Sequence, residues 1–128
     1  MDNKEIWEKK RICIIDDDND IREIYLMKFN LEGFDVVAAR DGEEGLRMIR
    51  EKRPDVILLD LQMPVKNGVE VLEELRKDEK LSKIPVVILS NIDTEEMFHE
   101  VGKFETRFYL IKSLTDPQKV VDYVREIL

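Results

Sequence analysis

The strongest constraint on the fold of this chain is a set of short apolar segments that recur along its length. Two of them, DVILLD at residues 55–60 and IPVVILS at residues 84–90, contain uninterrupted apolar stretches. Such stretches are typical of strands in a parallel sheet that is covered on both faces. The segments predicted as strands are residues 11–15, 34–40, 55–60, 84–90 and 107–112.

The segments between these strands carry helix signals. Asp41 with Glu44, and Asp93 with Glu96, have the spacing of a capping box at a helix start. Asp116 precedes a proline, as expected for a cap followed by the first helical residue. Apolar residues recur at helical spacing in each segment. The expected helices lie between residues 21 and 33, 41 and 54, 69 and 75, 93 and 102, and 116 and 128.

Alternating strands and helices predict an α/β fold in which a parallel sheet lies between two layers of helices. In such a doubly wound sheet the carboxyl ends of the strands share one edge, and a crevice opens where the winding direction reverses. Asp16 and Asp17 follow the first predicted strand. The third, fourth and fifth strands end at Asp60, Ser90 and Lys112. We therefore expect these five side chains to converge in one crevice.

The three carboxylates of this set need a positive partner, because like charges at short range repel. Lys112 compensates one of them by formal charge, and a divalent cation would balance the rest. A ligand set of oxygens without His or Cys favours Mg²⁺. A carboxylate beside a metal, a lysine and a hydroxyl can also attack phosphorus. We therefore predict an aspartyl phosphate at Asp60, with Lys112 and Ser90 stabilising charge on the transferring oxygens.

Length and charge limit the remaining classes of function. The 128 residues fit one domain. We expect a short charged lead over residues 1–10, containing Ile6 and Trp7, and a domain over residues 11–128 without a separate output domain. The 21 basic and 29 acidic residues give a net charge of -8, which disfavours direct binding to nucleic acid. Without a long apolar run, the sequence predicts neither a membrane span nor a signal peptide, and hence a cytoplasmic protein.

Four motifs at the predicted strand ends point to a known family. They are IIDDD with Asp16 and Asp17, LLDLQMPVKNG with Asp60, Met63, Pro64 and Gly68, ILS with Ser90, and YLIK with Tyr109 and Lys112. From Arg11 to Leu128 the chain resembles the receiver domain of bacterial two-component response regulators, in particular the stand-alone chemotaxis type. The resemblance implies a flavodoxin-like, doubly wound sheet of strand order 2-1-3-4-5 with five helices.

The resemblance also implies a phosphoryl transfer. A sensor histidine kinase or a histidine phosphotransfer protein would donate the phosphoryl group to Asp60. Asp17 and Asp60 would bind Mg²⁺ directly together with the backbone carbonyl of Gln62, and Asp16 would bind it through water. The protein would be a signalling phosphoacceptor that catalyses its own phosphorylation and dephosphorylation, and not an enzyme acting on a separate substrate.

A conformational switch follows from the same resemblance. Lys112 would pair with the phosphate, Ser90 would move towards a phosphoryl oxygen, and Tyr109 would turn inward behind it. These movements would change the face made by the fourth helix, the fifth strand and the fifth helix, where a downstream protein target would bind. Phosphorylation adds about -1.5 to -2 charge at one point, which can bias such a two-state surface. A homodimer formed on phosphorylation is a further expectation.

Two positions depart from the pattern of the family. Ser113 follows Lys112 where proline, preceded by a cis peptide, is usual. A cis bond to a non-proline residue costs about 2.5 to 4 kcal/mol, so a trans bond with a reshaped loop is the alternative. Asn91 stands where a small residue such as alanine is usual. We expect Asn91 to crowd or hydrogen-bond the phosphate and to alter the kinetics of phosphorylation.

Other interpretations remain open. A pseudo-receiver would signal through protein contacts without phosphorylation. A Mg²⁺-dependent phosphohydrolase would need a second acid close after Asp60, where Leu61 and Gln62 stand. A flavodoxin-like cofactor site is disfavoured because the loop after the first strand is acidic and repels phosphate. Asp18 and Asp20 are interpreted as helix-capping or turn residues.

Overall fold

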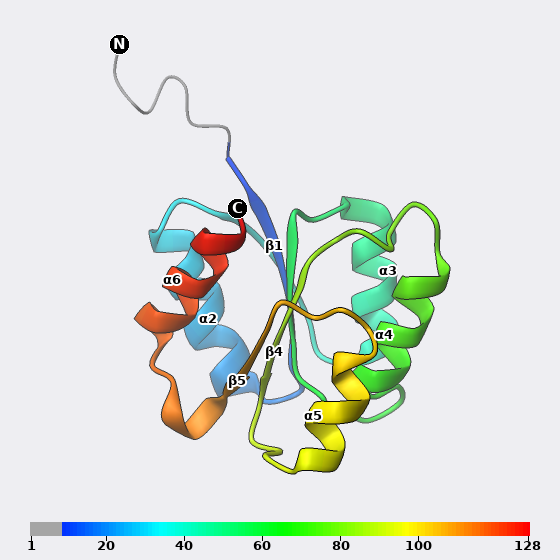
Figure 1. The fold of residues 1–128 in the computed structure, drawn as a ribbon. Helices are drawn as coiled ribbons and strands as arrows, with labels where there is room; N and C mark the ends of the chain where they lie inside the picture. Colours follow the sequence, from blue (N-terminus) through cyan, green and yellow to red (C-terminus); the bar gives the residue numbers. More distant parts are fainter. Residues whose placement is uncertain (1–8) are drawn as a thin grey trace.

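The computed structural model describes residues 9–128; Ile6 and Trp7 of the predicted lead lie outside these residues. Its central element is a sheet in which every neighbouring pair of strands is parallel, in the order β2-β1-β3-β4-β5 (Figure 1). The strands are β1 (Arg11–Ile15), β2 (Asp35–Ala39), β3 (Val56–Leu59), β4 (Val86–Ser90) and β5 (Phe108–Ile111). The predicted strand order is confirmed.

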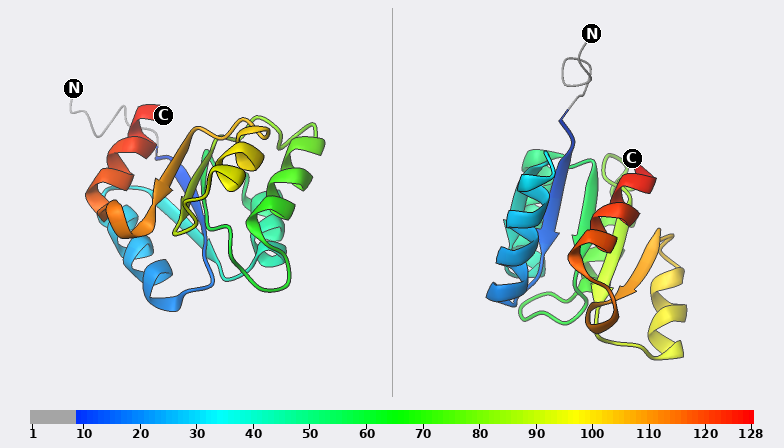
Figure 2. Two further views of the ribbon diagram at one scale, coloured as in Figure 1. Left: turned by 60° about the horizontal axis from the view of Figure 1, so that its bottom comes forward. Right: turned by 90° about the vertical axis from the view of Figure 1, so that its left-hand side faces the viewer.

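Helices cover both faces of this sheet (Figure 2). The α-helices in the described part of the chain are α2 (Asn19–Leu31), α3 (Gly42–Lys52), α4 (Gly68–Lys77), α5 (Glu95–Gly102) and α6 (Pro117–Ile127). A single 3-10 turn, η1 (Lys112–Leu114), connects β5 to α6. The doubly wound α/β fold predicted from the alternation of strands and helices is therefore confirmed.

Side-chain alternation along the strands divides the core into two layers. In β1, Cys13 and Ile15 pack with α3, α4 and α5, whereas Ile12 and Ile14 pack with α2 and α6. Successive residues of a strand point to opposite faces, so a continuously apolar strand can supply both layers. This burial fixes the register of the strands, and the register places their carboxyl ends at one edge.

The cap of one helix differs from the sequence prediction, and another helix has a cap for which no prediction was made. The cap of α5 is Thr94, whose hydroxyl accepts a hydrogen bond from the Met97 N–H at 3.2 Å. The capping box predicted for Asp93 and Glu96 is therefore wrong, because the helix begins one residue later than that box requires. A reciprocal capping box does occur at α4, where each side chain of the pair Asn67 and Glu70 accepts from the backbone N–H of the other.

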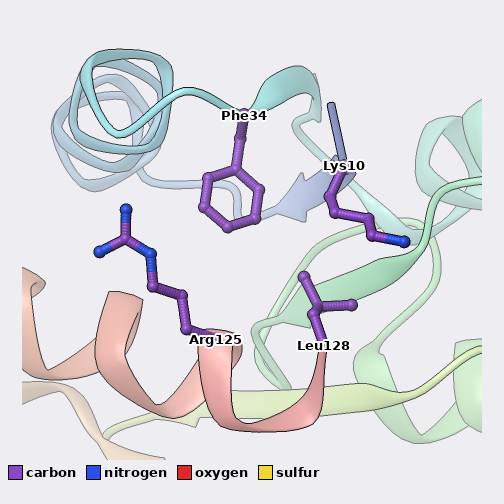
Figure 3. Close-up of a pocket in the computed structure, with 4 residues that line it drawn as sticks. All are labelled: Lys10, Phe34, Arg125 and Leu128. Carbon is purple, nitrogen blue, oxygen red and sulfur yellow. The ribbon is translucent and has the colours of Figure 1, made fainter. Parts of the chain in front are cut away.

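A cavity of about 230 Å³ opens at the amino edge of the sheet. Figure 3 shows its lining side chains, which come from the segment before β1, the turn before β2 and the last turn of α6. They are Lys10, Phe34, Arg125 and Leu128. The carboxyl ends of the strands, where the sequence predicts the functional site, lie at the opposite edge. No helix within residues 9–128 is both long enough and apolar enough to cross a membrane.

Candidate functional site

Three aspartates come together at the carboxyl edge of the sheet. Asp16 and Asp17 follow β1, and Asp60 follows β3. Strands β1 and β3 are neighbours with Ile15 opposite Leu59, so the residues that follow these strands meet directly. One carboxylate oxygen from each aspartate lies within 4.8 Å of the other two. Asp16 and Asp60 are buried and Asp17 is exposed, so the cluster has two inner members and one outer member.

Lys112 reaches this cluster from β5, the strand at one end of the sheet order. It follows β5, which is separated from β1 by β3 and β4. Its Nζ lies 2.9 Å from Oδ2 of Asp16 and 3.5 Å from Oδ2 of Asp60. Its side chain is 15% exposed, so the ion pairs are mostly shielded from water. The expected convergence of Lys112 with the aspartates is therefore present in the structure.

Backbone hydrogen bonds orient the two inner carboxylates. The Leu61 N–H donates to Oδ1 of Asp60 at 2.8 Å, and the Asp18 N–H donates to Oδ1 of Asp16 at 3.0 Å. Each inner aspartate thus has one oxygen held by the backbone and the other facing Lys112. Asp18 in turn caps α2, because its side chain accepts from the N–H groups of Asp20 and Ile21. The outer aspartate, Asp17, has no hydrogen bond or ion pair within residues 9–128.

The electrostatics of the site depend on burial and on close charges. Burial and the nearby charge of Asp16 raise the pKa of Asp60 from 3.8 to about 6, although the charge of Lys112 opposes this shift. Burial alone would lower the pKa of Lys112, but its hydrogen bond to Asp16 and the charge of Asp60 raise it overall. Lys112 is therefore a permanent cation at neutral pH, and Asp60 is mostly ionised there.

The donor set fits a hard divalent cation. The cluster offers carboxylate oxygens from two strand ends and contains neither His nor Cys. Gln62 lies two residues after Asp60 in the loop between β3 and α4. That its backbone carbonyl binds the metal stays a prediction. That Asp17 binds the metal directly and Asp16 through water stays a prediction as well.

Ser90 and Tyr109 both form hydrogen bonds with the backbone of Ile92. Ser90 ends β4 and is fully buried, and its hydroxyl accepts a hydrogen bond from the Ile92 N–H at 3.2 Å. Tyr109 on β5 donates its hydroxyl to the Ile92 carbonyl at 2.6 Å. The Phe98 ring of α5 packs edge-to-face on Tyr109 with ring centroids 4.7 Å apart. The two residues predicted to form the switch are thus joined through the backbone of the loop between β4 and α5.

The peptide bond after Lys112 decides between the two alternatives that the sequence left open. No peptide bond in the described part of the chain is cis, so the Lys112–Ser113 bond is trans. Residues Lys112–Leu114 form η1, the reshaped loop that the trans alternative requires. The Ser113 N–H donates to Oδ1 of Asn91 at 3.0 Å. The two positions that depart from the family pattern therefore contact each other, which no sequence pattern indicated.

Gly68, part of the LLDLQMPVKNG motif, has a packing role that the motif alone does not explain. A Cβ atom at this residue would lie 2.5 Å from the backbone oxygen of Asp60 and 2.8 Å from Cα of Leu61. Both distances are too short for real contacts. The glycine therefore allows the start of α4 to pack directly against the backbone that carries Asp60.

A model of the family described as "Response regulator receiver domain" matches residues 12–125. The "Probable transcriptional regulator ycf27" of Porphyridium aerugineum is 32% identical over 121 residues, which are 94% of this chain and 49% of that protein. The "DNA-binding response regulator MtrA" of Mycolicibacterium smegmatis is 40% identical over 82 residues, which are 64% of this chain and 35% of that protein. The chain thus spans half or less of the length of these curated relatives.

Solved structures show the same fold. The chemotaxis protein CheY4 of Vibrio cholerae superimposes with a TM-score of 0.88 at 25% identity, covering 94% of this chain and 100% of that one. The Francisella response regulator 1452 receiver domain superimposes with a TM-score of 0.84 at 32% identity, covering 93% of this chain and 96% of that one.

Proposed function

The chain belongs to the response regulator receiver domain family, and we propose that Asp60 is its Mg²⁺-dependent phosphoacceptor. The observation that carries this proposal is the convergence of Asp60, Asp16 and Lys112: Nζ of Lys112 lies 3.5 Å from Asp60 and 2.9 Å from Asp16. The proposed donor is a sensor histidine kinase or a histidine phosphotransfer protein, in the cytoplasm. The domain proposed to perform this reaction spans residues 11–128.

The transfer requires an ionised nucleophile with a fixed orientation. A carboxylate oxygen of Asp60 would bond to phosphorus while the bond from phosphorus to the donor's imidazole nitrogen breaks and the imidazole keeps the electron pair. With a pKa of about 6, Asp60 is mostly ionised at pH 7 and can donate the electron pair. Its hydrogen bond from the Leu61 N–H holds the carboxylate in place during the attack.

Charge on the transferring oxygens needs a counter charge at the same place. Lys112 supplies a positive charge that is already held between the carboxylates, so little reorganisation is needed when the phosphoryl group arrives. Asp16, Asp17 and Asp60, with the carbonyl of Gln62, would hold the Mg²⁺ ion. When bound, this ion supplies additional positive charge to the phosphoryl oxygens. The buried Ser90 hydroxyl at the end of β4 is the proposed hydrogen-bond partner of a phosphoryl oxygen.

The proposed output is a change in the face formed by α5, β5 and α6. Ser90 accepts from the Ile92 N–H, so a movement of Ser90 towards the phosphoryl group would remove this bond and free the loop before α5. Tyr109 binds the carbonyl of the same residue and would respond with it. The proposed partner on this face is another protein, or a second copy of this chain in a homodimer. The net charge of -8 disfavours nucleic acid as the partner, because its phosphates are also negative.

Phosphorylation by a small donor tests the proposal. Wild-type protein incubated with Mg²⁺ and acetyl phosphate is expected to gain the mass of one phosphoryl group. The Asp60→Asn variant is expected to gain none. Asp18→Asn is the matched control, because Asp18 lies in the same acidic segment but caps α2, and asparagine caps as well as aspartate.

The outcomes separate the alternative functions. If wild-type protein gains no mass although it binds Mg²⁺, the chain is a pseudo-receiver and the proposal is wrong. A phosphoryl group that remains on the Asp60→Asn variant would place the acceptor elsewhere. Rapid and continuous release of phosphate would instead indicate a phosphohydrolase.

A further inference from the structure

We propose that Asn91 is a positioning residue for Lys112, acting through its hydrogen bond to the Ser113 N–H. This inference rests on the proposed function of Asp60, because it concerns the lysine that contacts that aspartate. It assigns the Asn91 side chain to the loop that carries Lys112, and not to direct contact with the phosphoryl group.

The hydrogen bond lies just beyond the last pair of residues that joins β4 and β5. The paired register of these strands ends with Ser90 opposite Ile111. Asn91 directly follows β4 and Lys112 directly follows β5. The N–H of Ser113, the residue after Lys112, donates to Oδ1 of Asn91 at 3.0 Å. A side-chain oxygen thus continues the link between the two strands by one further hydrogen bond. It does so at the residue next to the proposed catalytic lysine.

The same bond supplies a missing cap to η1. The first N–H groups of a 3-10 or α-helical turn have no partner inside the turn. The residue at the cap position, Ile111, has an apolar side chain and makes no side-chain hydrogen bond to η1. Asn91, from the neighbouring loop, binds one of these N–H groups instead. The conformation of the backbone directly after Lys112 is therefore held from outside the turn.

The position of this backbone matters because the Lys112 side chain has to extend past the ends of β4 and β3 to reach its partners. Its ammonium group reaches from the end of β5 to Asp16, which follows β1. A long, flexible side chain keeps such a position at a lower entropic cost when its own backbone is fixed. Loss of the Asn91 bond would therefore loosen the contacts of Lys112 with Asp16 and Asp60.

The two residues of this pair depend on each other. A proline at position 113 would have no N–H and could not donate to Asn91. An alanine at position 91 would have no side-chain acceptor for the Ser113 N–H. The effects of changing the two positions should therefore be strongly non-additive.

Amide exchange in Mg²⁺-free, unphosphorylated protein tests the hydrogen bond by itself. In Asn91→Ala, protection of the residue 113 amide is expected to fall by about 2- to 10-fold, the loss of one net hydrogen bond. Ser113→Ala keeps the N–H and is expected to retain the wild-type protection. Unchanged protection in Asn91→Ala would overturn the proposal. This measurement needs no phosphorylation, so it can fail or succeed independently of the role of Asp60.

A double-mutant cycle tests the effect on Lys112. Asn91→Ala, Ser113→Pro and the double variant are each expected to slow phosphorylation by acetyl phosphate by about 2- to 10-fold, with the double variant no slower than the slower single variant. The NMR signal of the Lys112 ammonium group should shift in all three. If Ser113→Pro does not fold, this signal in Asn91→Ala decides the test.

Two results would overturn the positioning role. One is a further slowing by Asn91→Ala in the Ser113→Pro background, which would mean that Asn91 acts directly on the phosphoryl group. The other is an unchanged Lys112 ammonium signal in Asn91→Ala. If wild-type protein is not phosphorylated at all, the proposed function fails, while amide exchange and the ammonium signal still decide whether Asn91 positions Lys112.

Discussion

The ammonium group of Lys112 lies 2.9 Å from Oδ2 of Asp16, although the two residues follow strands that are separated by two others in the sheet. Asp16 is 3% exposed, so this is a mostly buried ion pair. The lysine also approaches Asp60, at 3.5 Å. One cation thus neutralises part of the charge of two carboxylates.

Removal of the lysine should destabilise the protein most when Mg²⁺ is absent. Lys112→Met leaves Asp16 and Asp60 without their shared counter charge, and we expect the free energy of unfolding in EDTA to fall by about 1 to 3 kcal/mol. Saturating Mg²⁺ should reduce the deficit, because the ion replaces the missing charge. Urea unfolding with and without Mg²⁺ measures both values, with the exposed Lys119→Met as control. An equal deficit under both conditions would contradict a shared site.

The ionisation of Asp60 should oppose folding in the Mg²⁺-free protein. Its pKa is about 6 in the folded state and 3.8 ordinarily, so the folded protein binds this proton more tightly than the unfolded chain does. Protonated Asp60 therefore contributes to the free energy of unfolding. This contribution is fully present below about pH 4 and is lost as the pH rises through 6. Asp60→Asn should therefore stabilise the protein by about 1 to 2 kcal/mol at pH 7.5 and by less at pH 4.5.

Urea unfolding of wild type and Asp60→Asn in EDTA at the two pH values measures this difference. The comparison isolates Asp60 because the other carboxyl groups are common to both proteins. A variant that is less stable than wild type at pH 7.5 would show that the ionised carboxylate is favourable in the fold, contrary to the raised pKa.

Adjacent aspartates should differ sharply in their effect on Mg²⁺ binding. Asp17→Asn removes a carboxylate of the cluster, and we expect the affinity for Mg²⁺ to fall by at least about 10-fold. Asp18→Asn keeps the cap of α2 and should leave the affinity within about 2-fold of wild type. Calorimetric titration at pH 7.5 measures both. Similar losses in the two variants would mean that general negative charge, and not a defined site, attracts the ion.

Glycines at two helix ends should respond differently to alanine. Gly68→Ala places a Cβ 2.5 Å from the Asp60 carbonyl oxygen, and we expect it to cost about 1 to 3 kcal/mol of stability and to weaken Mg²⁺ binding as Asp60 shifts. A Cβ at Gly102 meets nothing within 4 Å, so Gly102→Ala should be neutral or stabilise by up to about 1 kcal/mol. Thermal unfolding and Mg²⁺ titration compare the pair. Equal stability of the two variants would refute the close approach at Gly68.

The sequence by itself determined the architecture of this protein and the location of its polar strand ends. Continuous apolar runs can be recognised within a few residues, and they indicate strands of a parallel sheet. Right-handed crossovers then leave few possible orders for those strands. Asp16, Asp60 and Lys112 could be assigned to one edge because the carboxyl ends of parallel strands coincide there. Helix starts were less certain, since Asp93 and Thr94 are both good caps and the sequence favoured the wrong one.

The tertiary structure alone decided which side chains touch within that edge. The bond between Asn91 and Ser113, the reach of Lys112 across two strands and the raised pKa of Asp60 all depend on separations of a few ångström between residues distant in the chain. Hydrophobic periodicity selects the face and the register of an element, but it carries no information on which rotamer a polar side chain adopts or on how much water reaches it. Those quantities are set only when the strand ends, the loops and the helix starts pack together.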